Sequence, residues 1–190
     1  MADRLECLSY ALRNEVGGSK NGGLTDDPAD PGGLTKFGIC QRDHPTVDIR
    51  ALTLAGAIAI LTDEYWSCAG LNDNCVAAKF IDLAVNLEGT GKQGAAVKIL
   101  QGAIDMQFPD SLREDGVYGP FTESQANRCN PASLLMAMDS LACSWYRADV
   151  ACHPNLAKYL DGWLARARRI PVYDPTAVPG DRITAGIEAA

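Results

Sequence analysis

Apolar side chains recur at helical spacing through most of the chain after residue 53, and this pattern limits the fold more than any other feature. Residues spaced three and four apart lie on one face of a helix, so each such stripe needs a partner to cover it. Asn130-Pro131 and Pro154-Asn155 are helix start signals along this part of the chain. The pattern predicts a mainly α fold. It also predicts that segment 54–66, which is apolar on nearly all sides, lies in the interior.

The segment before residue 53 has a different character. A first helix is expected from Asp3 to Glu15, with an apolar stripe made of Leu5, Leu8 and Leu12. Segment 16–50 then lacks periodicity and is rich in glycine, proline and aspartate, which is typical of a functional loop or of disorder. Alternating apolar residues in 34–39 allow a short strand or a small β-hairpin within it.

Composition narrows the class of protein. The chain has 190 residues and 47% hydrophobic content, enough for one well-buried core. Its net charge of -7 argues against nucleic-acid binding, which needs a positive surface. The one basic cluster, Arg166 with Arg168 and Arg169, is interpreted as a solvated face near a helix C-terminus. No apolar run is long enough for a membrane span, and the N-terminus does not resemble a signal peptide.

The cysteines and histidines give little support to a metal site. Seven cysteines occur without a Cys-x-x-Cys pair, and His44 and His153 are isolated. We therefore expect no metal and no cofactor. Buried free thiols are expected, although a Cys68–Cys75 or Cys143–Cys152 bridge would fit an oxidising compartment.

Glu15 is the residue whose position suggests chemistry. It follows Leu12 by three residues, so a continuing helix carries its carboxyl along the apolar stripe. Partial removal from water favours the neutral form of a carboxyl, which is the form that donates a proton. Cleavage of a glycosidic bond also needs a second carboxylate, and the acidic loop supplies Asp26, Asp27 and Asp30. Calcium binding by the same loop is the weaker alternative, because the EF-hand pattern is absent.

The loop sequence Gly22-Gly23-Leu24-Thr25-Asp26-Asp27-Pro28-Ala29-Asp30-Pro31-Gly32-Gly33-Leu34-Thr35-Lys36-Phe37-Gly38-Ile39 resembles the signature of glycoside hydrolase family 108. Asp63-Glu64-Tyr65-Trp66 and Phe80-Ile81-Asp82-Leu83-Ala84-Val85-Asn86 are similar to further family motifs. Leu100-Gln101 with Asp115-Gly116-Val117-Tyr118-Gly119-Pro120-Phe121-Thr122 resembles the associated peptidoglycan-binding module. The resemblance implies a lysozyme-like helical fold. It also implies N-acetylmuramidase activity on bacterial peptidoglycan.

The resemblance also implies roles for individual residues. It makes Glu15 the catalytic acid, Asp30 the second carboxylate and Thr35 the water-orienting hydroxyl. About six extra residues follow Glu15 relative to the family pattern, so Asp26 and Asp27 remain alternatives to Asp30. The expected sugar-binding residues are Tyr65, Trp66, Asp82 and Asn86, whereas Trp145 and Trp163 are expected in the core.

These expectations combine into one hypothesis. Residues 1–90 form a catalytic part, residues 91–170 a helical peptidoglycan-binding part in the same globule, and residues 171–190 a tail. The chain is expected to be a monomeric phage endolysin, cytoplasmic until it is released to the cell wall. The acidic net charge fits this less well, because it gives weak attraction to an anionic wall. A non-catalytic wall-binding protein and a lytic transglycosylase are the alternatives.

Overall fold

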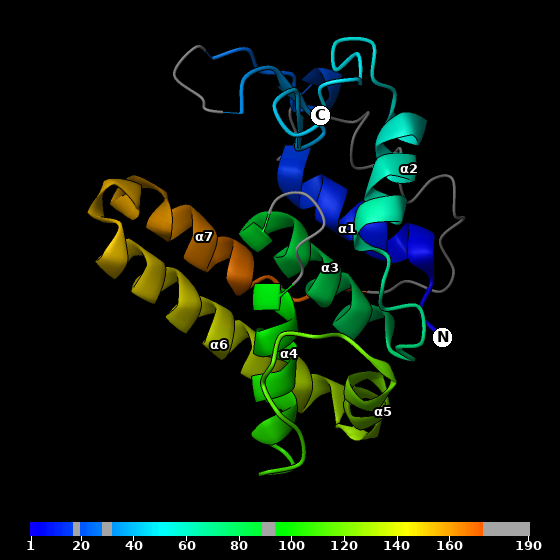
Figure 1. The fold of residues 1–190 in the computed structure, drawn as a ribbon, viewed down its shortest axis with the longest axis vertical. Coiled ribbons are helices and arrows are strands. Elements are labelled where there is room, and N and C mark those ends of the chain that lie inside the picture. The colour runs from blue at the N-terminus through cyan, green and yellow to red at the C-terminus, as the bar shows by residue number, and fades with distance from the viewer. Residues whose placement is uncertain (17–19, 28–31, 89–93, 173–190) are drawn as a thin grey trace.

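The computed structural model describes residues 1–16, 20–27, 32–88 and 94–172. This part of the chain is mainly helical, which confirms the predicted fold class (Figure 1). The α-helices are α1 (Arg4–Val16), α2 (Leu54–Tyr65), α3 (Asn74–Glu88), α4 (Gly94–Asp105), α5 (Pro120–Arg128), α6 (Pro131–Cys152) and α7 (Leu160–Ala167). Two 3-10 helices, η1 (Lys20–Gly23) and η2 (Pro154–Tyr159), and two strands, β1 (Thr35–Lys36) and β2 (Ile39–Cys40), complete the described elements.

The helix start signals act as the sequence predicts. The Thr53 side chain accepts a hydrogen bond from Gly56 N at the start of α2, and Asn130 accepts one from Ser133 N at the start of α6. Pro154 differs, because it opens the 3-10 helix η2 before the α-helical turns of α7 begin. The expected last helix is therefore split in two.

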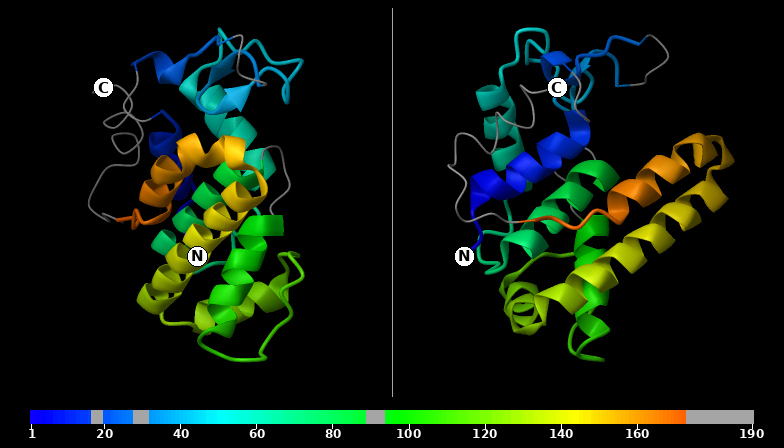
Figure 2. Two further views of the ribbon diagram at one scale, coloured as in Figure 1. Left: turned by 90° about the vertical axis from the view of Figure 1, so that its left-hand side faces the viewer. Right: turned by 180° about the vertical axis from the view of Figure 1, so that it is seen from behind.

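The helices pack around α3, which contacts α1, α2, α4 and α6. The views in Figure 2 show α6 and α7 side by side as a helical hairpin that extends away from the strands. The contacts of α3 with α4 and α6 join the two expected parts, 1–90 and 91–170, whose separate roles stay a prediction. Of the helices in the described segments, none has the length and apolar character to cross a bilayer.

The expectation that segment 54–66 is an interior helix is wrong. Helix α2 lies at the edge of the fold, beside the strands (Figure 1). Only Ala57, Leu61 and Tyr65 on it are buried, at four-residue intervals. The small alanines on its other faces made the segment apolar without giving it enough side-chain surface to need covering on all sides.

Helix α6 also differs from the expectation in one residue. Trp145 is 41% exposed, so its assignment to the core is wrong. The buried stripe passes through Met138, Ala142 and Tyr146 instead, one residue away from Trp145. Trp163 does pack against the core, where its ring stacks with that of Tyr146 at a centroid distance of 5.3 Å.

A fully buried lysine fixes the end of α7 against the rest of the fold. Lys79 of α3 forms an ion pair with Asp139 of α6 at 2.5 Å. Its ammonium also donates to the carbonyl oxygens of Ala167 and of Arg169, the latter at 3.0 Å. A cation at a helix C-terminus satisfies the last carbonyls and complements the helix dipole. Tyr10 of α1 donates to the same Arg169 oxygen at 2.9 Å, so α1 and α3 together position α7.

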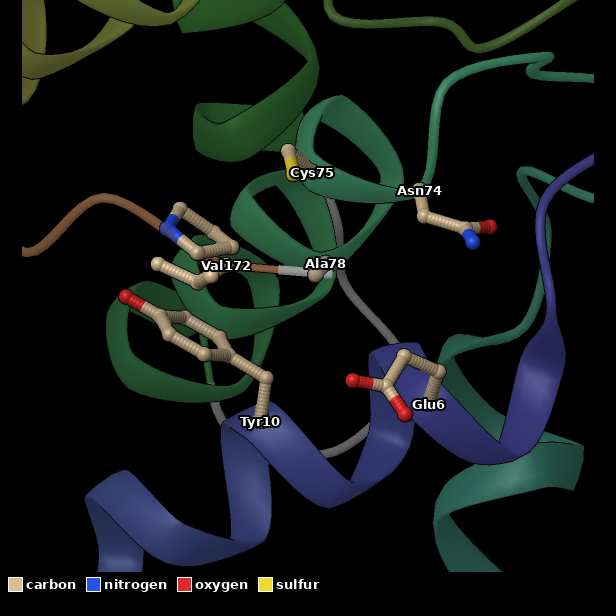
Figure 3. Close-up of a pocket in the computed structure, with 7 residues that line it drawn as sticks. Glu6, Tyr10, Asn74, Cys75, Ala78 and Val172 are labelled. Atoms are coloured by element: carbon tan, nitrogen blue, oxygen red, sulfur yellow. The ribbon is translucent and has the colours of Figure 1, made fainter. Parts of the chain in front are cut away.

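The chain that follows α7 continues along α1 and α3. Figure 3 shows Val172 next to the Tyr10 ring, and Ala78 of α3 lines the same small pocket. The space left among these residues is about 10 Å³, close to the volume that one water molecule needs. This close packing extends the anchoring of α7 to residues 171 and 172.

Candidate active site

The last turn of α1 brings Glu15 to the edge of the core. Leu8, Leu12 and Val16 on this helix are buried, and they hold α1 against α3. Glu15 follows Leu12 by three residues, and its side chain is 19% exposed. The carboxyl is therefore largely withdrawn from water while it keeps an opening to solvent, as the sequence predicts.

The β1–β2 hairpin forms one wall of this site. Its two turn residues, Phe37 and Gly38, have φ angles of 56° and 77°, which is the left-handed region that a two-residue hairpin turn requires. A Cβ atom on Gly38 would lie 2.9 Å from Glu15 Cγ and 3.0 Å from Glu15 Oε2. Only glycine lets the main chain approach the carboxyl this closely.

The loop before the hairpin supports it from the other side. Phe37 N donates to Gly22 O at 2.7 Å, and the Phe37 ring covers Gly22 so closely that any side chain there would collide with it. Thr25 and Thr35 exchange two main-chain hydrogen bonds of 2.9 Å. The half-buried Thr35 hydroxyl donates to Gly33 O at 3.0 Å. These bonds place Thr35 on the strand that leads directly into the Gly38 turn.

Helix α7 supplies the cation of the site. Arg166 Nη2 lies 2.6 Å from Glu15 Oε1 and 2.8 Å from Asp82 Oδ1. Burial acts to lower the pKa of Arg166, but the neighbouring carboxylates of Glu15 and Asp82 outweigh it, and the pKa lies above its usual value. One permanent positive charge is therefore shared by two carboxyl groups.

The ion pair corrects the sequence interpretation of the basic cluster. Arg166 is 11% exposed and is not part of a solvated face. It follows Trp163 by three residues, and this spacing was the available signal that Arg166 lies on the packed side of its helix. The guanidinium is instead the ion-pair partner of the candidate acid, Glu15.

The candidates for a second carboxylate are only partly described. Asp30 lies outside the described residues, and its role stays a prediction. Asp26 is largely exposed and is bound to Arg50 through a side-chain ion pair. Asp27 is exposed on the same loop and also has a partner. The choice among the three carboxyls therefore remains as the sequence left it.

The expected sugar-binding residues do not gather at one place. Asp82 joins Glu15 through Arg166, and Asn86 accepts a hydrogen bond from Tyr146. Tyr65 is buried. Trp66 lines a separate pocket of about 410 Å³ at the start of α1, with Met1, Ala2, Asp3, Arg4, Leu5 and Ala69.

The distance along α1 separates this pocket from the candidate acid. At 1.5 Å per residue, the start of α1 lies about 17 Å from Glu15 along the helix axis. Contacts of Tyr65 and Trp66 with sugar stay predictions.

The described residues give no support to metal chemistry. Among them, no three histidine, cysteine or acidic side chains are arranged to hold an ion. All seven cysteines are free thiols, as expected, and four of them are buried. Burial raises the pKa of the Cys68 thiol to about 12, so this sulfur stays protonated and unreactive.

The fold and the position of Glu15 together define a class of protein. A mainly helical fold in which a mostly buried carboxyl lies next to the turn of a small hairpin is lysozyme-like, and it suits acid-assisted cleavage of a glycosidic bond. Residues 18–87 match the family Glycosyl hydrolase 108. This match confirms the family resemblance of the loop and makes the chain a glycoside hydrolase. Glu15 lies three residues before the matched segment, and the Gly38 turn that approaches it lies within that segment.

A solved structure supports the fold over most of the chain. The structure of Brucella abortus SagA is similar with a TM-score of 0.56 and 23% identity, over 84% of this chain and 96% of that chain. No curated protein matches the chain. The match to Glycosyl hydrolase 108 supports the coarse activity that the resemblance implies, a peptidoglycan hydrolase.

Proposed function

We propose that this glycoside hydrolase is an N-acetylmuramidase. It cleaves the β-1,4 bond from N-acetylmuramic acid to N-acetylglucosamine in peptidoglycan, with Glu15 as the general acid. The observation that carries the proposal is the Glu15 carboxyl, mostly buried at a helix end and in contact with the Gly38 turn of a loop that matches the family.

The chemistry follows from this position. Glu15 donates its proton to the bridging oxygen as the glycosidic bond breaks, and positive charge develops on the sugar ring. A second carboxylate, Asp30 in this proposal, stabilises that charge or activates water on the opposite face. The Thr35 hydroxyl lies on the strand next to the Gly38 turn, where it orients the water. The incoming water replaces the leaving sugar, and its released proton restores the acid.

Glu15→Gln is the direct test. The amide keeps the shape of the side chain, but its N–H groups are not acidic, so it cannot act as a general acid. We expect the clearing of purified cell walls to fall by at least about a hundredfold. Glu123→Gln is the matched control, because Glu123 is a partly buried carboxyl on α5 that accepts hydrogen bonds from Gly70 N and from the Tyr118 hydroxyl.

The outcomes separate the proposal from its alternatives. A wild-type protein that binds walls without clearing them would be a wall-binding protein instead. Products with anhydro ends would indicate a lytic transglycosylase. Equal activity of Glu15→Gln and wild type would refute the assigned acid. Asp26→Asn, Asp27→Asn and Asp30→Asn, measured separately, identify the second carboxylate as the variant with the largest loss.

We also propose that the enzyme acts as a phage endolysin, held in the cytoplasm until it reaches the wall. The support is the similarity of its loop to a family that includes phage muramidases. Expression inside a Gram-negative host tests this role: cells should lyse only after chloroform opens the inner membrane. Lysis without chloroform would show that the chain crosses the membrane unaided, and no lysis after chloroform would contradict the role.

A further inference from the structure

Three helices meet at one guanidinium in the candidate site. The Arg166 side chain of α7 reaches Glu15 at the end of α1 and Asp82 in the middle of α3. The same nitrogen, Nη2, contacts both carboxyls, at 2.6 Å and 2.8 Å. Arg166 Nε adds a second bond to Asp82, at 3.1 Å. Two carboxyl groups therefore compete for one cation.

The two carboxyls are not equivalent. Asp82 is 1% exposed, and its Oδ1 atom accepts from Arg166 and also from Asn14 Nδ2 at 2.9 Å. Asp82 is therefore fixed by donors from two helices, Asn14 of α1 and Arg166 of α7. Glu15 is more exposed, at 19%, so it is the carboxyl placed to exchange a proton with solvent or substrate.

Asp82 also has unused bonding capacity. Its Oδ2 atom is buried and has no hydrogen-bond partner among the described residues. Arginine and carboxylate groups form their strongest pair when two N–H groups meet two oxygens. A small rotation of the Asp82 carboxyl would offer Oδ2 to Nη2 while Nε keeps Oδ1. The complete pair would then withdraw Nη2 from Glu15.

From this geometry we infer that Asp82 is a positioning residue that draws Arg166 away from Glu15 and so allows Glu15 to carry its proton. This inference rests on the proposed function and gives Asp82 a role other than sugar binding. When Arg166 turns to Asp82, Glu15 takes a proton from solvent, and it donates that proton to the bridging oxygen as the glycosidic bond breaks. The proton released by the attacking water restores the starting state.

Within the described segments, the remaining polar groups around the cluster do not supply a competing carboxylate. Tyr10 and Tyr146 face it from α1 and α6, and burial raises the pKa of both hydroxyls, that of Tyr10 to about 12. Lys79 and Asp139 form their own neutral pair. Arg169 is a second cation nearby, but it donates to the Asn14 side chain at 2.9 Å. Arg166 is therefore the cation in ion-pair contact with Glu15, and Asp82 is the described carboxyl that shares it.

The test is the pH–rate profile of wall hydrolysis for Asp82→Asn. Without its charge, Asp82 no longer holds Arg166, so the guanidinium stays on Glu15 and the acid loses its proton at lower pH. We expect the alkaline limb to move down by about one pH unit, which is an activity loss of about tenfold above both midpoints. Activity should return toward the wild-type value when the pH falls below the shifted limb. A purely structural defect would not be reversed by acid.

A double variant and a control complete the experiment. Asp82→Asn with Arg166→Gln replaces the charged pair by two amides, and its alkaline limb should lie above that of Asp82→Asn alone. This comparison also applies if the single variant does not fold. Glu123→Gln, whose carboxyl is bound to Gly70 and Tyr118, should leave the limb in place.

The pH–rate profiles distinguish the role of Asp82 from the role of Glu15. An alkaline limb of Asp82→Asn that coincides with wild type would overturn the inference, and so would a double variant whose limb lies at or below that of the single variant. Glu15→Gln distinguishes a failure of this inference from a failure of the proposed function. If Glu15→Gln is inactive at every pH while the Asp82 limb does not move, only the role of Asp82 fails. If Glu15→Gln remains active, the proposed function fails first.

Discussion

Replacing Gly38 by alanine should damage the site far more than the fold. The added Cβ atom would lie 2.9 Å from Glu15 Cγ, 3.0 Å from Oε2 and 3.2 Å from Cδ. Ordinary contacts between carbon atoms begin at about 3.5 Å, so the carboxyl or the hairpin turn must move by roughly half an ångström or more. Misplacement by about 1 Å can cost a hundredfold in rate, and we therefore expect a loss of about tenfold in kcat.

Gly33→Ala is the matched control for this prediction. Gly33 has φ +70°, close to the +77° of Gly38, but a Cβ atom there would meet nothing within 4 Å. Both variants should lose about 1–2 kcal/mol of unfolding free energy from the left-handed backbone, measured by urea denaturation. Only Gly38→Ala should lose wall-clearing activity. If the two variants keep equal activity, contact between the turn and Glu15 is not part of the site.

Three further predictions concern the fold. Lys79→Met leaves Asp139 without its ion-pair partner and the end of α7 without its cation, so the free energy of unfolding measured by urea denaturation should fall by about 3–5 kcal/mol. A loss below about 1 kcal/mol would contradict a stabilising role for this ion pair. Gln101→Leu removes the amide that binds Asp115 and neighbouring main-chain groups. We expect the free energy of unfolding to fall by about 2–3 kcal/mol and hydrogen exchange in 115–122 to become faster, whereas unchanged exchange would contradict this role of Gln101. The hydrogen bond from Arg42, and after it the one from Cys40, lowers the pKa of Asp43 to about 2. The ionised Asp43 carboxylate therefore stabilises the fold above about pH 4, and this contribution is lost as the pH falls toward 2. Asp43→Asn should be less stable than wild type at pH 7 and equally stable near pH 2.

Local signals in the sequence were sufficient for most of the helices. Thr53 and Asn130 cap α2 and α6 as their residue types predict, since a cap depends only on the next three residues. The interior position of segment 54–66 could not be judged in the same way. Hydrophobic content says that a helix can be buried, whereas its actual burial depends on which neighbours are available to cover it.

The site was predictable only where it depends on neighbours in sequence. The place of Glu15 on the apolar side of α1 follows from its spacing to Leu12. The ion pair with Arg166 joins residues 151 positions apart, and it requires α7 to return to α3, which no local pattern specifies. The approach of Gly38 to Glu15 likewise depends on how the loop folds back over the helix end.

The identity of the new reducing end tests the central claim most directly. Purified peptidoglycan digested by the wild type and by Glu15→Gln can be analysed by mass spectrometry after borohydride reduction. The account predicts hydrolysed fragments that end in reduced N-acetylmuramic acid with the wild type, and none with the variant. Fragments that end in reduced N-acetylglucosamine, or the same fragments from the Glu15→Gln protein, would contradict it.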